Sequence, residues 1–598
     1  MSKTTHRCLA ALATTIFLTI AGCSNSSSNS SSNLPVGAAQ KGGTVTIALP
    51  PAQAPNYIFP LYSGANWTAA NNGYLQPQLF RPLYWFGNDG RPTENPTLSL
   101  ADLPVYSNGG RTITITLKPY NWSDGQPVTT RDVEFWINLL KANKANYGPY
   151  FPGGFPDAVV SAKYSSPTTF SLTLNKKYNP DYLMSLMSVI TPIPQQAWDK
   201  TSASGPIGNY DETTAGAKAV YNFLNAQSSH LATYATNPLW KVIDGPFELK
   251  AFSLQGQVTL VPNPKYSGPV KPKISELIEE PFTTATAEFD VLRSGDLTYG
   301  YVPSTQYSHV SQLAHLGYRT ENWAGWQASW ASFNYHTSPW GQILSQEYVR
   351  QAMQLLVNQP SIAKNIYQGS AYPTYGPVPS VPVSPYVSSY TSHPTYSFNP
   401  AQAVQLLKSH GWTVKPNGVS TCSDPSKCGA GIAAGAKLSF PLLYISGDPA
   451  QDAMFQVLQS AFSAAGIQLQ LMSYPTTTVL GLQSCTTNCK WAISFGGIGW
   501  IYYPYPYPDG GVVWETGSVG ASIGNYSDKQ TDKLIAEDQV ASNLAALHAL
   551  DDHLAKSFAA LWLPTPANQI SEVQHNLAGT TPQDPTEAIT PEYWYFTK

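Results

Sequence analysis

The chain has 598 residues, a formal net charge of −3 and only 12% charged residues. A chain of this length exceeds a single hydrophobic core, so we expect two or three lobes. The lack of a basic excess argues against a nucleic-acid-binding surface, and we expect no nucleic-acid partner. Aromatic residues are plentiful, with 36 Tyr and 16 Trp, and such side chains suit both wet clefts and ordinary cores.

The first 22 residues have the pattern of a signal peptide. A short basic start precedes the uncharged apolar stretch 9–20, which is too short to span a bilayer. The small residues Ala21 and Gly22 precede Cys23, and together they resemble the lipobox of bacterial lipoproteins. The resemblance implies cleavage after residue 22 and attachment of a diacylglyceryl group to the Cys23 thiol. The alternative is an ordinary signal peptide followed by a chance cysteine.

A polar tether follows the predicted anchor. Residues 24–33 are only Ser and Asn, so we expect residues 23–40 to form a flexible, lipid-anchored linker. Acyl chains contribute about 0.8 kcal/mol per buried methylene, so two or three chains hold a protein durably at a membrane. We predict an extracytoplasmic body without a transmembrane span, on the periplasmic side or at the cell surface.

Strand and helix patterns are mixed along the body, so the predicted class is α/β (mixed α+β). Residues 111–117 alternate polar and apolar side chains, which predicts a strand. Thr129, with Asp132 three residues later, predicts the start of a helix. Asn399 followed by Pro400 predicts another helix start, with the cap before a proline at the first helical position.

Four cysteines lie in the body, namely Cys422, Cys428, Cys485 and Cys489. In an oxidising compartment, two local disulfides are the simplest explanation. Four cysteines allow three pairings, and the sequence does not choose among them. A four-cysteine zinc site is the alternative, but the spacings suit it poorly, and we expect no metal.

Sequence motifs for catalysis are absent. The chain contains no Gly-x-Ser-x-Gly, no His-Glu-x-x-His and no phosphate-binding glycine loop. Carboxylates are numerous enough to supply a glycosidase pair, but nothing in the sequence singles out two of them. We therefore predict no catalytic residue, no cofactor and no enzyme.

Several segments, in order, resemble family 5 of the extracellular solute-binding proteins, which are the peptide-binding or nickel-binding components of ABC importers. The matching segments are 112–133, which includes Trp122-Ser123-Asp124-Gly125, then 244–249, 261–266, 292–296, 348–353, 398–412 and 525–532. The resemblance covers about residues 41–598. The order of these segments along the chain supports the resemblance more strongly than any single motif does.

The resemblance implies a two-lobe, periplasmic-binding-protein-like fold with a hinge. Lobe I is expected at 41–282, with an extra subdomain inserted at about 80–190. Lobe II is expected at 283–567, and residues 568–598 are expected to return to lobe I. Hinge closure then buries the ligand between the lobes.

The resemblance places a ligand-binding residue shortly after Trp500. Peptide-binding members of the family commonly have an aspartate there that pairs with the α-amino group of the peptide, because a buried ammonium needs a charged partner. Tyr503 occupies that place, and the nearest carboxylate is Asp509. Either Asp509 reaches the amine through a changed loop, or this anchor is missing.

The aromatic residues nearby have two interpretations. We predict that Trp500, Tyr502, Tyr503 and Trp326 contact the ligand together with Asp509. In the alternative, residues 502–507 form a stiff Pro-Tyr loop outside the pocket, and core packing explains at least part of the tryptophan set around Trp326.

The predicted function is that of the substrate-binding lipoprotein of an ABC importer. It captures oligopeptides in a cleft between lobes and delivers them to permease subunits in the membrane. An oligosaccharide or another neutral solute in an aromatic cleft is the alternative, and a surface scaffold without a transport role is a third hypothesis. We expect a monomer that touches the membrane through its lipid anchor.

Overall fold

The computed structural model describes residues 37–485 and 487–598. The predicted signal peptide, Cys23 and the tether up to residue 36 lie outside the described residues. Within the described ranges the protein is mixed α/β, as predicted. None of the described helices has both the length and the apolar character that crossing a membrane requires.

The first large sheet has seven strands, in the order β13 (Tyr318–Trp323), β25 (Gln569–Gln574), β12 (Tyr299–Tyr301), β2 (Thr44–Ala48), β11 (Glu276–Glu280), β10 (Val258–Pro262) and β9 (Phe247–Phe252). The central strand β2 runs parallel to β11 and β12, whereas β25 pairs antiparallel with β12 and β13. The resemblance starts lobe II at residue 283, but β12 and β13 complete this sheet. Because β12 pairs with β2 and β13 pairs with β25, the chain leaves the first large sheet for the second only after Trp323.

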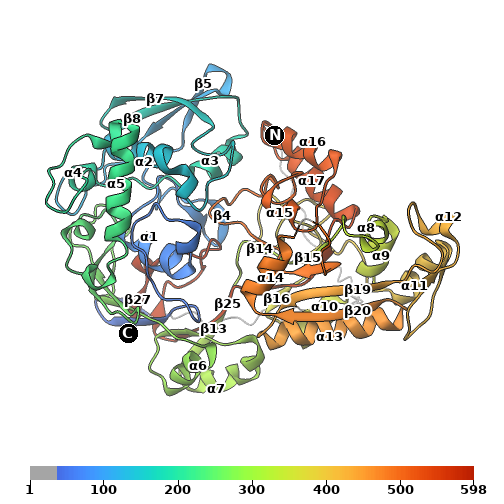
Figure 1. Ribbon diagram of the computed structural model, residues 1–598. Coiled ribbons are helices and arrows are strands. Elements are labelled where there is room, and N and C mark those ends of the chain that lie inside the picture. The colour runs from blue at the N-terminus through green and yellow to red at the C-terminus, as the bar shows by residue number, and fades with distance from the viewer. Residues whose placement is uncertain (1–36, 486) are drawn as a thin grey trace, which may run out of the picture. The chain divides into compact units, whose positions relative to one another are not determined.

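The second large sheet has five strands, in the order β20 (Gln468–Tyr474), β19 (Ser439–Ile445), β21 (Ile493–Phe495), β15 (Trp330–Phe333) and β23 (Leu561–Trp562). β19 runs parallel to β20 and β21, and five of its seven residues are buried. Parallel strands are covered on both faces, which explains this continuous apolar run. Helix α13 (Pro449–Ala464) connects β19 to β20 and lies along them in Figure 1.

A third sheet of four antiparallel strands has the order β5 (Val105–Ser107), β6 (Thr112–Thr116), β8 (Thr169–Leu174) and β7 (Val159–Ser166). β6 confirms the strand predicted at 111–117. Helix α2 (Thr130–Asn143) follows, and its predicted start is confirmed, because Thr129 and Asp132 form a capping box. The start predicted at Asn399 is also confirmed, since this residue caps α11 (Pro400–Ser409).

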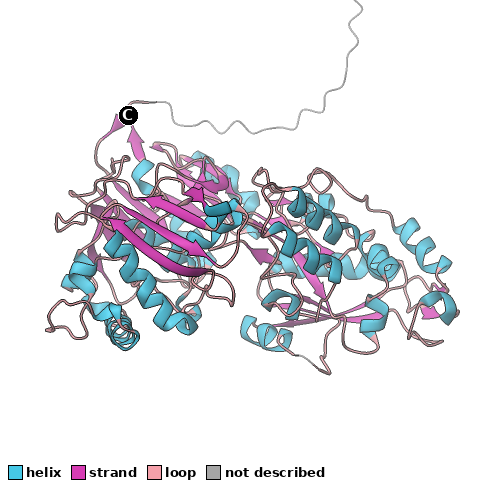
Figure 2. Ribbon diagram, turned by 90° about the horizontal axis from the view of Figure 1, so that it is seen from above, coloured by secondary structure: helices cyan, strands magenta, loops and turns pink. Residues whose placement is uncertain are grey.

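Short ladders and further helices complete the described structure, with helices flanking the strands in Figure 2. The ladders are β1 (Ala39–Gln40) with β27 (Tyr595–Thr597) and β26 (Leu577–Ala578); β3 (Phe86–Asn88) with β4 (Arg91–Glu94); β14 (Gln327–Ala328) with β22 (Trp500–Ile501); β16 (Ala371–Tyr372) with β24 (Thr565–Pro566); and β17 (Trp412–Thr413) with β18 (Thr421–Cys422). The helices are α1 (Gln76–Leu79), α3 (Pro180–Met187), α4 (Gln195–Trp198), α5 (Thr214–Gln227), α6 (Ala285–Ser294), α7 (Val310–His315), α8 (Trp340–Leu344), α9 (Glu347–Gln354), α10 (Gln359–Asn365), α12 (Pro425–Cys428), α14 (Thr476–Gln483), α15 (Val519–Ser522), α16 (Lys529–Asp538) and α17 (Ala545–Lys556).

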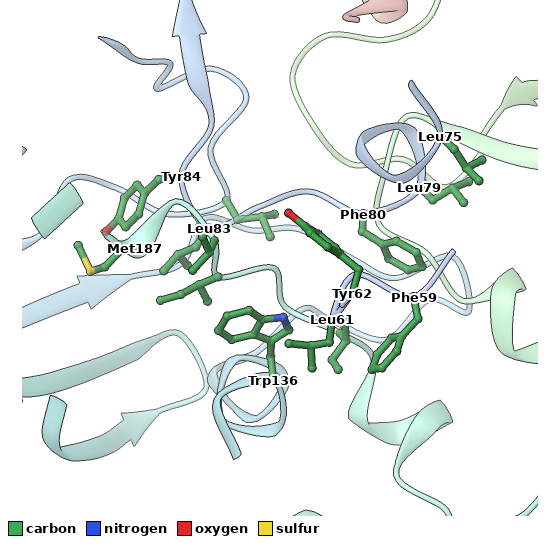
Figure 3. Close-up of a cluster of buried hydrophobic side chains, with 14 of the residues drawn as sticks. Phe59, Leu61, Tyr62, Leu75, Leu79, Phe80, Leu83, Tyr84, Trp136 and Met187 are labelled. Carbon is green, nitrogen blue, oxygen red and sulfur yellow. The ribbon is translucent and has the colours of Figure 1, made fainter. Parts of the chain in front are cut away.

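Each large sheet has its own hydrophobic core. Around the first sheet, Phe59 and Leu61 pack in one cluster with Trp136 of α2, as Figure 3 shows. The second cluster gathers residues of β15, β19 and β23, including Phe333 and Phe440. The separation of these two largest clusters agrees with the expectation that a chain of this length divides its apolar residues.

The four body cysteines form two local disulfides, Cys422–Cys428 and Cys485–Cys489. This is the arrangement that the spacing favours, and it leaves none of the four for zinc. Among the described residues, no group of three or more His, Cys, Asp and Glu side chains is placed to hold a metal ion.

Candidate functional site

A cavity of about 900 Å³ is lined from both large sheets, and we call it the shared cavity. On the first sheet, residues that follow β2, β11 and β12 line it, among them Gln53, Ala285 and Ser304. On the second sheet, Asp448 follows β19, and residues 496–498 follow β21. The carboxyl ends of two sets of parallel strands therefore meet at this cavity, which is where open α/β sheets bind ligands.

The charged side chains of the shared cavity are both carboxylates, Asp448 and Glu587. The described residues that line it include no Lys, Arg or His. Asp448 is engaged within the protein, because its Oδ1 accepts from the Ala450 amide at 2.8 Å and its Oδ2 from Gln451 Nε2 at 2.9 Å. These contacts cap the start of α13, so Asp448 has a structural role.

Glu587 differs from Asp448, because no described residue forms a hydrogen bond or ion pair with its carboxylate. Its backbone has φ 71°, a left-handed conformation that is uncommon for a residue with a side chain. Burial raises the pKa of the Glu587 carboxyl to about 7. A carboxylate held in this way against a cavity is a functional-site candidate.

Aromatic rings form much of the remaining wall. The rings that line the shared cavity belong to Trp67, Tyr74, Tyr301, Trp323 and Tyr367. Tyr74 lies in a short π-helix, η2 (Ala70–Leu75), an element that is rare and frequent at functional sites. Burial raises the pKa of the Tyr74 hydroxyl well above its usual range, so this group stays protonated.

A second, smaller cavity of about 110 Å³ lies beside Tyr503, and we call it the aromatic pocket. Its lining includes Tyr62, Trp85 and Tyr503. Thr586 and Ala588 line it too, whereas Glu587 lines the shared cavity. The chain around Glu587 therefore contributes to the walls of both cavities.

Three of the five side chains that were predicted to contact the ligand pack against other parts of the same chain. The Tyr502 hydroxyl donates to the Pro377 carbonyl at 2.8 Å, and Trp326 Nε1 donates to the Pro506 carbonyl at 2.7 Å. Both side chains are buried. Trp500 is half-buried in β22 and lines a separate small pocket with Trp330.

The other two predicted contacts are Tyr503 and Asp509. Tyr503 packs against Trp67 with ring centroids 6.3 Å apart, which brings it to the edge of the shared cavity. Asp509 is 8% exposed, and its Oδ2 accepts from Gln539 Nε2 at 3.1 Å. None of the five, all within the described residues, lines the shared cavity, and their roles in ligand binding stay a prediction.

The Pro-Tyr segment 502–507 ties the chain after β22 to both ends of α3 and to the end of α16. Tyr507 accepts from Asn179 Nδ2 at 3.0 Å and donates to Asp538 Oδ1 at 2.9 Å. Ser188 Oγ donates to the Pro504 carbonyl at 2.7 Å. These partners explain why the tyrosines of this segment are held in the structure.

Glu587, Trp67 and Tyr74 are absent from the contacts predicted from the sequence. No motif marks Glu587, which is one acid in the proline-containing stretch 582–591. Its position becomes visible only because the chain after β25 returns beside η2, where the Ile589 amide donates to the Gly73 carbonyl at 3.0 Å.

Comparisons with known proteins agree on one family. Residues 95–516 match the bacterial extracellular solute-binding proteins, family 5 Middle. A putative ABC transporter peptide-binding protein of Brucella ovis is 26% identical over 348 residues, 58% of this chain and 58% of the relative. The oligopeptide-binding protein OppA of Bacillus subtilis is 25% identical over 340 residues, 54% of each chain. The aligned region thus spans little more than half of these relatives.

Solved structures share the fold across nearly the whole chain. The substrate-binding protein CtaP from Listeria monocytogenes has a TM-score of 0.71 at 18% identity and covers 94% of this chain and 100% of its own. AppA from Bacillus subtilis, in complex with a nonapeptide, has a TM-score of 0.65 at 17% identity and covers 94% and 100%. On the match over 95–516, the chain belongs to family 5 of the bacterial extracellular solute-binding proteins, a family of binding proteins and not of enzymes.

Proposed function

We propose that this chain is the lipid-anchored, extracytoplasmic substrate-binding protein of an ABC importer, and that it binds oligopeptides in the shared cavity. The observation that carries the proposal is a cavity of about 900 Å³ at the carboxyl ends of parallel strands from both large sheets. Relatives described as peptide-binding proteins support the ligand class. Delivery to permease subunits and a monomeric state are part of the same proposal.

The walls of the shared cavity suit an extended peptide. Cavities of roughly 300–1,000 Å³ hold small ligands when apolar walls carry a few polar groups that fix orientation. Here the aromatic rings supply apolar surface, and Ser304, Gln327 and Asn568 supply hydrogen-bonding groups. Backbone groups of a peptide pair with such side chains, while its side chains contact the rings.

A neutral oligosaccharide is the second candidate. The observation that favours it is the set of Trp and Tyr rings on the cavity wall, since sugars stack on aromatic faces. It makes no use of the unpaired Glu587 carboxylate, so we rank it after the peptide.

The ligand class is tested by thermal shift and calorimetry with mixed peptide and oligosaccharide libraries. A ligand at a hundredfold excess over its Kd stabilises the folded state by about 2.7 kcal/mol, which gives a measurable rise in Tm. Peptide hits without oligosaccharide hits are the expected result. Stabilisation by oligosaccharides alone would replace the peptide by the second candidate, and no hit in either library would overturn the binding role in the shared cavity.

The lipid anchor is tested separately, because Cys23 lies outside the described residues. Cells that express the chain are labelled with a fatty-acid analogue, and the expected label disappears in Cys23→Ala. Retention of the label in that variant would place the anchor elsewhere.

A further inference from the structure

We propose that Glu587 is the anionic contact for a cationic group of the bound solute, an ammonium in the case of a peptide. The inference rests on the proposed function in one respect: the shared cavity is where the solute binds. It assigns the charged anchor to the chain that follows β25, and it places that anchor among aromatic rings.

The charge balance of the shared cavity is the first argument. Its charged side chains are Asp448 and Glu587, and no basic side chain is among the described residues that line it. Asp448 already accepts hydrogen bonds from Ala450 and Gln451, so Glu587 is the carboxylate left to a ligand. Glu587 is half-buried at the cavity wall, and a bound solute would desolvate its carboxylate at a cost that a cation from the solute offsets.

The second argument is that the backbone of Glu587 is held in place. A Cβ added at Gly73 would lie 2.4 Å from the Glu587 carbonyl oxygen, so the two chains are in close contact. Asp584 secures the preceding turn, because its carboxylate accepts from Trp85 Nε1 at 2.8 Å and from Thr586 Oγ1 at 2.7 Å. A left-handed residue with fixed neighbours holds its Cα–Cβ bond in one direction, which limits the positions that its carboxylate can take.

The third argument is the set of rings beside the carboxylate. Tyr74 lines the shared cavity with Glu587. The pKa of the Tyr74 hydroxyl is raised by burial, then by Tyr299 and then by the Glu587 charge, and that of Tyr503 by burial and then by the Glu587 charge. Trp67 packs on Tyr503, and its own ring lines the shared cavity. An ammonium beside Glu587 therefore meets a carboxylate together with aromatic faces, which attract cations by about 0.5–2 kcal/mol each.

The same charge balance makes a prediction about the other end of a peptide. Because no basic side chain lines the shared cavity among the described residues, the terminal carboxylate of a peptide has no ion-pair partner there. Affinity then depends on the free amino terminus of the peptide. Converting its carboxyl terminus to an amide is expected to leave affinity unchanged or to improve it.

The probes are random pentapeptide mixtures without Lys, Arg or His, prepared with a free amino terminus, an acetylated amino terminus or an amidated carboxyl terminus. Putrescine, a dication without peptide bonds, is titrated beside them. Binding is measured by calorimetry on wild type, on Glu587→Gln and on the control Glu94→Gln, a half-buried glutamate that lines neither cavity. Gln keeps the size of Glu, and the Tm of each variant without ligand checks the fold.

We expect wild type to bind the free-amine and amidated mixtures at least about tenfold more tightly than the acetylated mixture. Loss of a charge-assisted hydrogen bond lowers affinity by about this factor. Glu587→Gln is expected to remove that preference, whereas Glu94→Gln keeps it. Equal binding of free and acetylated mixtures by wild type, or an unchanged preference in Glu587→Gln, overturns the inference.

Failure of the proposed function has a different signature. If no peptide mixture binds wild type but putrescine binds in a Glu587-dependent way, the peptide ligand is wrong and the cation contact stands. If neither putrescine nor any peptide shows Glu587-dependent binding, the cation contact itself is overturned.

Discussion

Two short segments, 502–509 and 582–589, line the same aromatic pocket, but their polar side chains differ in whether they have hydrogen-bond partners within the protein. In the first segment, the hydroxyls of Tyr502 and Tyr507 and the Asp509 carboxylate have partners within the protein. In the second, the Asp584 carboxylate is satisfied by Trp85 and Thr586, whereas the Glu587 carboxylate has no partner among the described residues.

The difference shows how to separate packing from recognition. In segment 502–509 the hydroxyls of Tyr502, Tyr505 and Tyr507 are engaged within the protein, so little of their hydrogen-bonding capacity is left for a solute. A single charged group that faces a cavity without a partner carries a desolvation cost that binding can offset. Segment 582–589, with its unpaired Glu587 carboxylate, is therefore a better candidate for recognition than segment 502–509 with its four tyrosines.

The largest expected effect comes from Gly73→Ala. The added Cβ meets the Glu587 carbonyl oxygen at 2.4 Å, so the backbone that presents the carboxylate must shift. We expect affinity for the free-amine pentapeptide mixture to fall about tenfold and the free energy of unfolding to fall by about 1–3 kcal/mol. Calorimetry and denaturant unfolding measure the two effects.

The matched control for this variant is Gly481→Ala, because Gly481 lies inside α14 and an added Cβ there meets nothing within 4 Å. We expect it to leave affinity unchanged. Normal affinity in Gly73→Ala would show that the position of Glu587 does not govern binding.

The next effect is a pH dependence of affinity. Burial raises the pKa of Glu587 to about 7, so the carboxyl is largely neutral below that pH and cannot pair with an ammonium. The hydroxyls of Tyr74 and Tyr503, which sense the Glu587 charge, stay protonated because burial raises the pKa of both. Affinity for the free-amine mixture should rise up to about tenfold per pH unit below pH 7 and fall above about pH 8, where a peptide amine loses its proton.

Calorimetry from about pH 5.5 to pH 8.5 checks this profile. The acetylated mixture and the Glu587→Gln variant should both give a flat profile. A flat profile for wild type with the free-amine mixture would mean that another group carries the charge contact.

A smaller effect, on stability alone, is expected from Tyr507→Phe. The lost hydroxyl bonds Asn179 and Asp538, and both partners are buried. We expect the free energy of unfolding to fall by about 1–3 kcal/mol with peptide affinity unchanged. The control is Tyr505→Phe, which removes a bond to the Pro149 carbonyl from a half-buried ring and should cost less. A loss of affinity in Tyr507→Phe would return this segment to the binding site.

The smallest effect is expected from Asp509→Asn. The amide keeps an acceptor for Gln539, so peptide affinity should stay within about twofold of wild type. Burial raises the pKa of Asp509 from 3.8 to about 6, so its ionisation costs stability as the pH rises through that window. The variant lacks this cost. Its Tm should therefore fall less between about pH 5 and pH 8 than the Tm of wild type. Weaker binding of free-amine peptides would identify Asp509 as the anchor.

Local features of the fold were accessible from the sequence because they depend on neighbouring residues. The alternation at 111–117 gives β6, and Thr129 with Asp132 gives the capping box of α2. The close spacing of Cys422 and Cys428 favours the local disulfide that the structure contains. The first sheet was harder, since β12 and β13 join it through partners hundreds of residues away in the chain.

By itself, the sequence determined the mixed α/β class and the family resemblance, because periodicity and caps act over a few residues. It favoured two local disulfides, and the structure decided their pairing. Only the tertiary structure decided which side chains share a cavity. Glu587 and Tyr74 come together because the chain after β25 returns to η2, whereas Trp326 and Tyr502 turn into the packed core. Whether a polar group is satisfied or left for a ligand depends on such distant neighbours, and the residue's own place in the sequence does not reveal it.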